Sequence, residues 1–156
     1  WPKIKQDYKD IKLHMIGRLQ TNKVKFVIPL FDYIHSLDSL KLAKKIYEEQ
    51  NRIKKNLKIF IQVNIGKEDQ KSGINEGYLE EFYKKCISEF NLDIVGLMCL
   101  PPNNSDSSDY FLKMKDLAKK HNLKELSMGM SNDYLEAVKH GATFVRVGSA
   151  IFGNRS

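Results

Sequence analysis

The residues of this chain that could do chemistry are concentrated in two short segments near its end, Leu126–Ser131 (LSMGMS) and Phe144–Ser149 (FVRVGS). Each segment is β-rich, runs into a glycine and a hydroxyl, and is followed by a helical pattern. A turn of this kind presents backbone N–H groups at the start of a helix, where a phosphate binds readily. Phosphate sites of (β/α)8 barrels are commonly built after the last two strands. Together the two segments therefore predict a phosphate site, although either one alone is a weak signal.

Arg146 lies between Val145 and Val147 in an apolar strand, where it shares a face with Phe144 and Gly148. Burying a guanidinium costs free energy unless the group is paired. Two interpretations follow from this. Arg146 is either a core residue paired with a carboxylate from a neighbouring strand, or a ligand-binding group. The glycine turn two residues later favours the ligand-binding role.

The hydroxyl and the glycines of the two segments also have simpler explanations. Ser131 can cap a helix that begins at Asn132, and a capping hydroxyl can bind a phosphate at the same time. Gly129 and Gly148 can serve only to permit tight turns. Finding both turns on consecutive strands is what favours a ligand site.

Other reactive side chains give weaker signals. His14 and His35 are isolated histidines in strands, which are more often hydrogen-bonded core residues than acids or bases. Lys71 follows a strand and could reach the mouth of the barrel to meet an aldehyde. Cys86 and Cys99 are too few for a disulfide framework and have no metal-binding spacing, so we expect packed, inert thiols.

The elements that must position these residues alternate regularly between short β-rich runs and longer helical stretches. Several strands are apolar almost throughout, which is typical of a parallel sheet covered by helices. The predicted strands are Lys12–Gly17, Asp32–Ser36, Lys58–Ile65, Asp93–Cys99, Glu125–Met128 and Thr143–Val147. The predicted helices are Asn22–Ile28, Ser39–Gln50, Glu76–Phe90, Ser107–His121 and Asn132–His140, the last of them ended by Gly141.

This alternation predicts an α/β fold, a (β/α)8 TIM-type barrel of which about six of the eight βα units are present. A closed barrel takes about 250 residues, and two further units of about 30 residues would bring these 156 residues near that size. We therefore expect residues 1–156 to form a single barrel domain whose first two βα units precede Trp1.

Composition limits the classes of partner. The formal charge of +7 is the balance of 26 basic and 19 acidic residues, and only four of the basic residues are arginines. These residues form no stripe with interleaved aromatic side chains, so a solvated lysine-rich surface is favoured over a nucleic-acid interface. No apolar run approaches the ~20 residues of a membrane span, and no signal peptide opens the chain. We expect a cytoplasmic protein that binds neither nucleic acid nor membrane.

Several segments in order along the chain resemble one known family. They are His14–Lys23 (HMIGRLQTNK), Ile34–Asp38, Gln62–Ile65 with Lys71–Gly73, Gly96–Met98, Leu126–Ser131 and Val145–Gly153. The chain is similar to the pyridoxal 5′-phosphate homeostasis proteins of the YggS/PROSC type, which resemble the barrel domain of alanine racemase without its second domain. The resemblance covers essentially the whole chain.

The resemblance implies that pyridoxal 5′-phosphate (PLP) binds in the mouth of the barrel. The residues implied at the cofactor are Ser131, the backbone of Gly129 and Met130, and Gly148 and Ser149 at the phosphate, Arg146 at the pyridine nitrogen, and Ile16 and Met98 at the ring. No catalytic residue and no metal ligand is implied. The Schiff-base lysine of the family has no counterpart in these residues, so we expect it upstream of Trp1.

Arg146 at the pyridine nitrogen has a chemical consequence. Arginine only donates hydrogen bonds, so the nitrogen must accept and stays unprotonated, which makes the ring a weaker electron sink. The resemblance therefore implies a carrier that buffers or delivers PLP, with PLP-dependent apo-enzymes as recipients, and a monomer or weak dimer. The alternatives are a PLP-dependent amino-acid racemase-like enzyme and, from charge alone, a nucleic-acid-binding protein.

Overall fold

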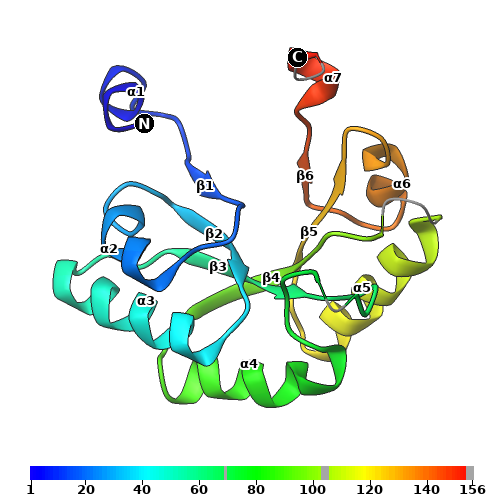
Figure 1. Ribbon diagram of the computed structural model, residues 1–156, viewed down its shortest axis with the longest axis horizontal. Helices are drawn as coiled ribbons and strands as arrows, with labels where there is room; N and C mark the ends of the chain where they lie inside the picture. Colours follow the sequence, from blue (N-terminus) through cyan, green and yellow to red (C-terminus); the bar gives the residue numbers. More distant parts are fainter. Residues whose placement is uncertain (69, 103–105, 154–156) are drawn as a thin grey trace.

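A single parallel sheet organises the chain. The computed structural model describes residues 1–68, 70–102 and 106–153. Each strand pairs with the next one along the chain, in the order β1 to β6 (Figure 1). The strands are β1 (His14–Met15), β2 (Tyr33–Leu37), β3 (Lys58–Val63), β4 (Asp93–Cys99), β5 (Glu125–Met130) and β6 (Phe144–Arg146). All six predicted strands are confirmed, and β5 extends two residues further than expected.

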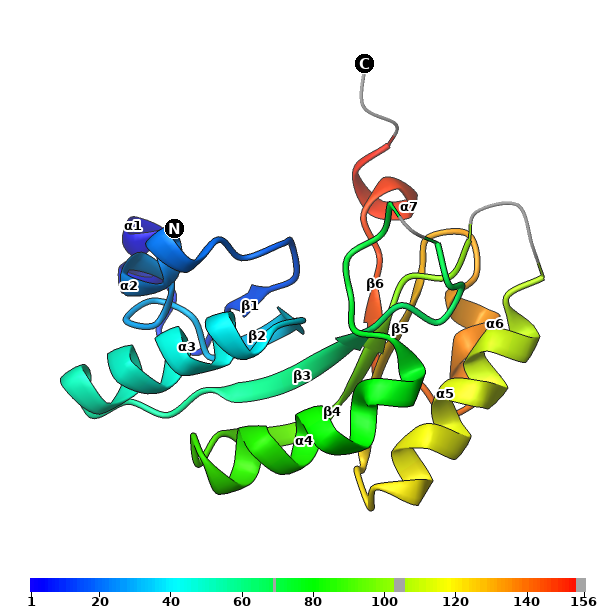
Figure 2. The same cartoon turned by 60° about the horizontal axis from the view of Figure 1, so that its bottom comes forward.

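Helices follow the strands in the predicted alternation. In Figures 1 and 2, α3, α4 and α5 lie along the outer side of the curved sheet. The helices are α1 (Pro2–Asp7), α2 (Val24–Val27, preceded by the 3₁₀ turn Thr21–Lys23), α3 (Leu40–Ile53), α4 (Leu79–Ser88, preceded by the 3₁₀ turn Glu76–Tyr78), α5 (Ser108–Lys120), α6 (Tyr134–Lys139) and α7 (Ser149–Phe152). Helix α1 was not predicted from the sequence, and α7 was expected only as a helical pattern after Phe144–Ser149, without bounds.

Helix α3 shows how local sequence sets these boundaries. The Ser39 hydroxyl accepts a hydrogen bond from the backbone N–H of Leu42 at 3.3 Å and so caps the first turn. Ala43 and Ile46 are fully buried on the face toward the sheet. The helix ends at Ile53, and the capping residue Lys54 adopts a left-handed conformation with φ 55°.

The hydrophobic core fills the layer between the sheet and these helices. Ile59 and Ile61 point into it from β3, and Phe82 and Phe111 meet them from α4 and α5. Cys86 also belongs to this cluster, as does Cys99 at the end of β4. Both thiols are buried, and burial raises the pKa of each to about 12, so they are packed and unreactive as predicted.

The sheet curls so strongly that side chains from its two outermost strands meet. The ring centroids of His14 in β1 and Phe144 in β6 are 5.6 Å apart, although these strands stand at opposite ends of the strand order. A flat sheet of six strands would hold them several strand spacings apart. The six βα units therefore form an open barrel segment, which confirms the predicted barrel architecture.

No helix in the described part of the chain is long and apolar enough to cross a membrane.

Candidate functional site

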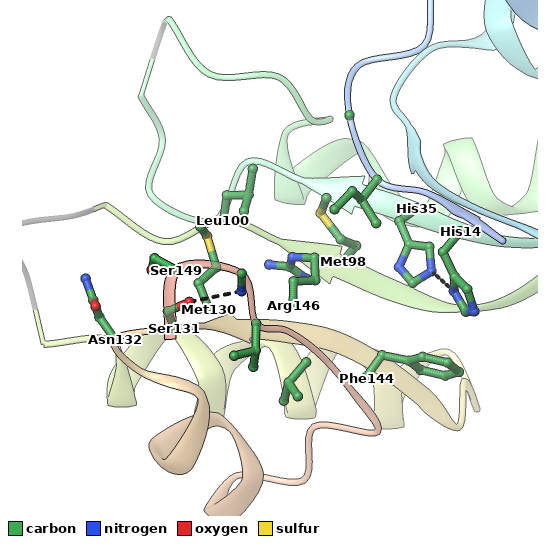
Figure 3. Close-up of a pocket in the computed structure, with 15 residues that line it drawn as sticks. His14, His35, Met98, Leu100, Met130, Ser131, Asn132, Phe144, Arg146 and Ser149 are labelled. Atoms are coloured by element: carbon green, nitrogen blue, oxygen red, sulfur yellow. Dashed lines mark hydrogen bonds between the residues drawn. The ribbon is translucent and has the colours of Figure 1, made fainter. Parts of the chain in front are cut away.

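A cavity of about 750 Å³ opens inside the curled sheet (Figure 3). Residues from both ends of the sheet line it, including His14 and His35 on one side and Ser131 and Ser149 on the other. Arg146 lies between these two sides (Figure 3). Pockets of about 300 to 1,000 Å³ hold small-molecule ligands and cofactors, so the size suits a cofactor.

The structure brings seven of the eight predicted site residues to this cavity. They come from the loop after β1, from β4, from the end of β5 and the residue after it, and from the end of β6 through the start of α7. The seven are Ile16, Met98, Met130, Ser131, Arg146, Gly148 and Ser149. Segments that are far apart in sequence therefore converge on one hollow.

Gly129 is the exception, because it does not line the cavity. Its φ is +89°, and a Cβ there would lie 2.6 Å from the Cβ of Ala137 and 3.0 Å from the Cα of Tyr134. Glycine at this position lets α6 pack closely against β5. Gly129 therefore serves the packing of α6. This is close to the simpler interpretation from the sequence, in which the glycine only permits a tight turn.

The predicted helix cap at Ser131 is wrong. Helix α6 begins later, with Asp133 as its N-cap residue. The Asp133 carboxylate accepts a hydrogen bond from the backbone N–H of Met130 at 2.6 Å and another from the Ser107 hydroxyl at 2.9 Å. The Met130 amide is thereby satisfied within the protein, which counts against its expected contact with a phosphate.

Ser131 instead connects the two turns. Its Oγ accepts a hydrogen bond from the backbone N–H of Gly148 at 3.1 Å (Figure 3). It accepts another from the backbone N–H of Ala150 at 3.4 Å, at the start of α7. A Cβ on Gly148 would meet no atom within 4 Å, so there is open space beside this turn. Helix α7 and the end of β5 therefore form one polar corner of the cavity.

Arg146 is paired, but not with the carboxylate that the sequence suggested as one alternative. Its Nη1 donates to Ser127 Oγ at 2.8 Å and its Nη2 donates to the backbone oxygen of Cys99 at 2.8 Å. Burial lowers the pKa of Arg146, an effect that Asp133 and Cys99 oppose. Because an arginine starts from a pKa above 12, the side chain remains a charged donor at neutral pH.

The two histidines are not isolated, which corrects the interpretation from the sequence. His14 Nδ1 and His35 Nε2 are 2.9 Å apart, and His35 Nδ1 is 2.8 Å from Ser127 Oγ. His35 is a buried, hydrogen-bonded core histidine as expected, whereas His14 is half-buried. Ser127, the residue that connects His35 to Arg146, was missed, because a serine inside an apolar strand carries no functional signal of its own.

Acid should destabilise the fold through His35. Burial lowers the pKa of His35 to about 3, and nearby His14 and Arg146 add to this effect. Between about pH 6.5 and that value the unfolded chain binds a proton that the folded chain excludes, so stability falls as pH falls. Urea unfolding between pH 7 and pH 5.5, where most carboxylates stay ionised, measures the slope.

A His35→Gln variant is the control for this measurement, because it cannot take up the proton. We expect the slope of its unfolding free energy against pH to be smaller than that of the unmodified chain. The difference corresponds to about one proton, which is at most about 1.4 kcal/mol per pH unit. Equal slopes in the two proteins would contradict the assignment of a neutral His35.

Lys71 does not line the main cavity. Its Nζ is 2.6 Å from Glu68 Oε2 and donates to the backbone oxygen of Pro101 at 3.1 Å. It borders a smaller cavity of about 280 Å³ that shares Ile16 and Leu100 with the main one. No lysine is among the described residues that line the main cavity.

Comparison with known proteins places this chain in a family. The family model of the alanine racemase N-terminal domain matches residues 5–156. A pyridoxal phosphate homeostasis protein from Aquifex aeolicus is 40% identical over 94% of this chain and 68% of its own length. The chain spans about two thirds of the length of this and the next curated relatives that it matches.

Solved structures agree with this placement. PipY of Synechococcus elongatus, determined with PLP bound, superposes with a TM-score of 0.86 at 30% sequence identity, covering 97% of this chain and 74% of its own. Alanine racemase from Corynebacterium glutamicum superposes with a TM-score of 0.73 at 15% identity, over 99% of this chain and 44% of its own, and shows the shared fold alone. The chain therefore belongs to the family of the alanine racemase N-terminal domain and, within it, to the pyridoxal phosphate homeostasis proteins.

Proposed function

We propose that this chain binds pyridoxal 5′-phosphate in the cavity around Arg146 and serves to buffer or deliver the cofactor. The observation that carries the proposal is that a fixed guanidinium and a polar turn at the start of a helix share one cavity. PipY, a relative with the same fold, was determined with PLP bound.

The residues of the cavity suit the parts of the cofactor. Open space beside Gly148, together with Ser131 and Ser149, leaves room for a phosphate at the polar corner. Met98 and Ile16 offer apolar surface for a ring. Arg146 has three guanidinium N–H groups beyond the two that donate to Ser127 and Cys99, and these can face a ring nitrogen.

Bound PLP supplies an electron sink, whose strength depends on protonation of its ring nitrogen. Arg146 holds its own protons and can only donate, so it favours an unprotonated nitrogen. A site of this kind retains the cofactor without strongly activating it. This favours storage or transfer of PLP. We further propose that it takes place in the cytoplasm, with PLP-dependent apo-enzymes as recipients and a monomer or weak dimer as the working form.

Binding of PLP to the intact chain, followed by the change in its absorbance and fluorescence, tests the proposal. We expect PLP to bind at least about tenfold more tightly than pyridoxal, which lacks the phosphate, because charge-assisted hydrogen bonds at the polar corner are then lost. Ser131→Ala should weaken binding of PLP but leave that of pyridoxal nearly unchanged, since only the phosphate meets this corner.

Ser88→Ala, at an exposed position at the end of α4, is the matched control and should bind PLP like the unmodified chain. Equal affinity of the unmodified chain for PLP and pyridoxal would show that the phosphate is not recognised, and the proposed site would be wrong.

A further inference from the structure

A continuous chain of hydrogen bonds crosses the inside of the barrel from β1 to β6. Arg146 Nη1 donates to Ser127 Oγ, Ser127 Oγ lies 2.8 Å from His35 Nδ1, and His35 Nε2 lies 2.9 Å from His14 Nδ1. His35 and Ser127 are separated by 92 positions in sequence. The second bond of Arg146, to the backbone oxygen of Cys99, holds the other side of the guanidinium.

The direction of every hydrogen bond in this chain follows from Arg146. A guanidinium cannot accept, so Ser127 Oγ must accept from it. Ser127 is fully buried, and in the described part of the protein its Oγ has only Arg146 and His35 as partners. The serine proton must therefore go to His35 Nδ1. Neutral His35 then carries its proton on Nε2 and donates it to His14 Nδ1, which leaves the proton of a neutral His14 on Nε2.

Aromatic side chains hold both imidazoles in place. The His35 ring stacks on Phe60 with centroids 4.3 Å apart, and the His14 ring stacks on Tyr33 with centroids 4.2 Å apart. Phe144 lies edge-on to His35 at 5.8 Å. Figure 3 shows His14, His35 and Phe144 gathered at the side of the cavity opposite Ser131 and Ser149. The two rings are thus fixed in position as well as in hydrogen bonding.

We propose that Ser127, His35 and His14 are positioning residues that fix the orientation of the Arg146 guanidinium toward a ring nitrogen of the bound ligand. The inference rests on the proposed function for the identity of the ligand. Without the serine acceptor, the guanidinium keeps only its bond to the Cys99 carbonyl and can rotate away from the cavity. The relay holds Arg146 through neutral groups and a backbone carbonyl, so none of its described hydrogen bonds goes to a carboxylate.

Histidine tautomers in the ligand-free protein provide the first test. In ¹⁵N-labelled protein, protonated and unprotonated imidazole nitrogens give well-separated chemical shifts, and the four histidines can be assigned by single substitutions. We expect both His14 and His35 to be neutral at pH 7 with the proton on Nε2. A proton on His35 Nδ1, or a charged His35, would overturn the relay whether or not the protein binds PLP.

Ligand discrimination provides the second test. Ser127→Ala and His35→Phe should each lower affinity for PLP about tenfold, the scale of one lost hydrogen bond to a charged group. Affinity for the 1-deaza analogue of PLP, which has carbon in place of the ring nitrogen, should change less than about threefold. His35→Phe is chosen because it retains an aromatic ring beside Phe60. Ser127→Thr retains the hydroxyl and should therefore keep most of the preference of the unmodified chain for PLP over deaza-PLP.

His121→Phe is the control, because His121 contacts Tyr83 outside the cavity. Equal losses of PLP and deaza-PLP affinity in folded variants would overturn the positioning role and indicate a general packing effect. If His35→Phe fails to fold, Ser127→Ala decides the question. Failure of the unmodified chain to bind PLP at all would refute the proposed function and the ligand-directed role together, while the tautomer measurement would still decide whether the relay exists.

Discussion

Replacing Arg146 with alanine is expected to lower the affinity of the chain for PLP by about 10- to 100-fold, because the change removes the charged donors that would face the ring nitrogen. It also removes the donors to Ser127 Oγ and to the backbone oxygen of Cys99. Isothermal titration or fluorescence titration with PLP measures the change. Arg146→Lys should recover only part of the affinity, because an ammonium cannot reach both acceptors and the ligand with a planar fork.

The matched control is Arg52→Ala. Arg52 lies on α3, is 64% exposed and pairs with Glu49 on the outer surface, so its loss should leave PLP affinity unchanged. Thermal unfolding of each variant establishes that the fold is retained. A folded Arg146→Ala protein that binds PLP as tightly as the unmodified chain would show that the guanidinium does not contact the cofactor.

Gly96→Ala should destabilise the protein by about 3 kcal/mol or more, because a methyl group has no space where β4 and β5 approach each other. A Cβ at Gly96 would lie 2.0 Å from the backbone oxygen of Glu125, its partner in the sheet register. Backbone atoms of two paired strands cannot move apart without breaking the hydrogen bonds of the ladder. The free energy of unfolding in urea measures the effect.

Gly77→Ala is the control for this substitution. Gly77 is exposed in the 3₁₀ turn before α4, and its added Cβ would come no closer than 3.5 Å to another atom. We expect its free energy of unfolding to change by no more than about 1 kcal/mol. Part of this change comes from the smaller conformational entropy of the unfolded chain when alanine replaces glycine. Similar stabilities of the two variants would mean that β4 and β5 do not pair as closely as described.

Local patterns in the sequence determined most of the secondary structure. Apolar runs such as Lys58–Val63 and the helix cap at Ser39 depend on neighbouring residues, so the strands and α3 were predicted close to their observed bounds. Helix α1 was missed, since its six residues bury no side chain and therefore leave no apolar pattern. The barrel architecture followed from the regular alternation of strands and helices.

The sequence also indicated the cavity, because parallel strands that end in similar turns bring those turns to the same edge of a sheet. Arg146, Ser131 and the Gly148–Ser149 turn do meet there. Their detailed partners were not predictable. Ser131 was expected to cap its own helix, but Asp133 takes that place and Ser131 receives two N–H groups from the next βα unit.

Only the tertiary structure decided what surrounds Arg146. The contact between His35 and Ser127 joins residues 92 positions apart, and it depends on the curl of the whole sheet and on the register shift in β5 after Ser127. A shift of one residue turns a side chain to the other face of a strand. Sequence patterns report which residues are buried and near a strand end, but hydrogen bonds across a barrel depend on geometry accumulated over every intervening strand. That is why the sequence identified Arg146, whereas the fold was needed to join it to Ser127, His35 and His14 in one chain of hydrogen bonds.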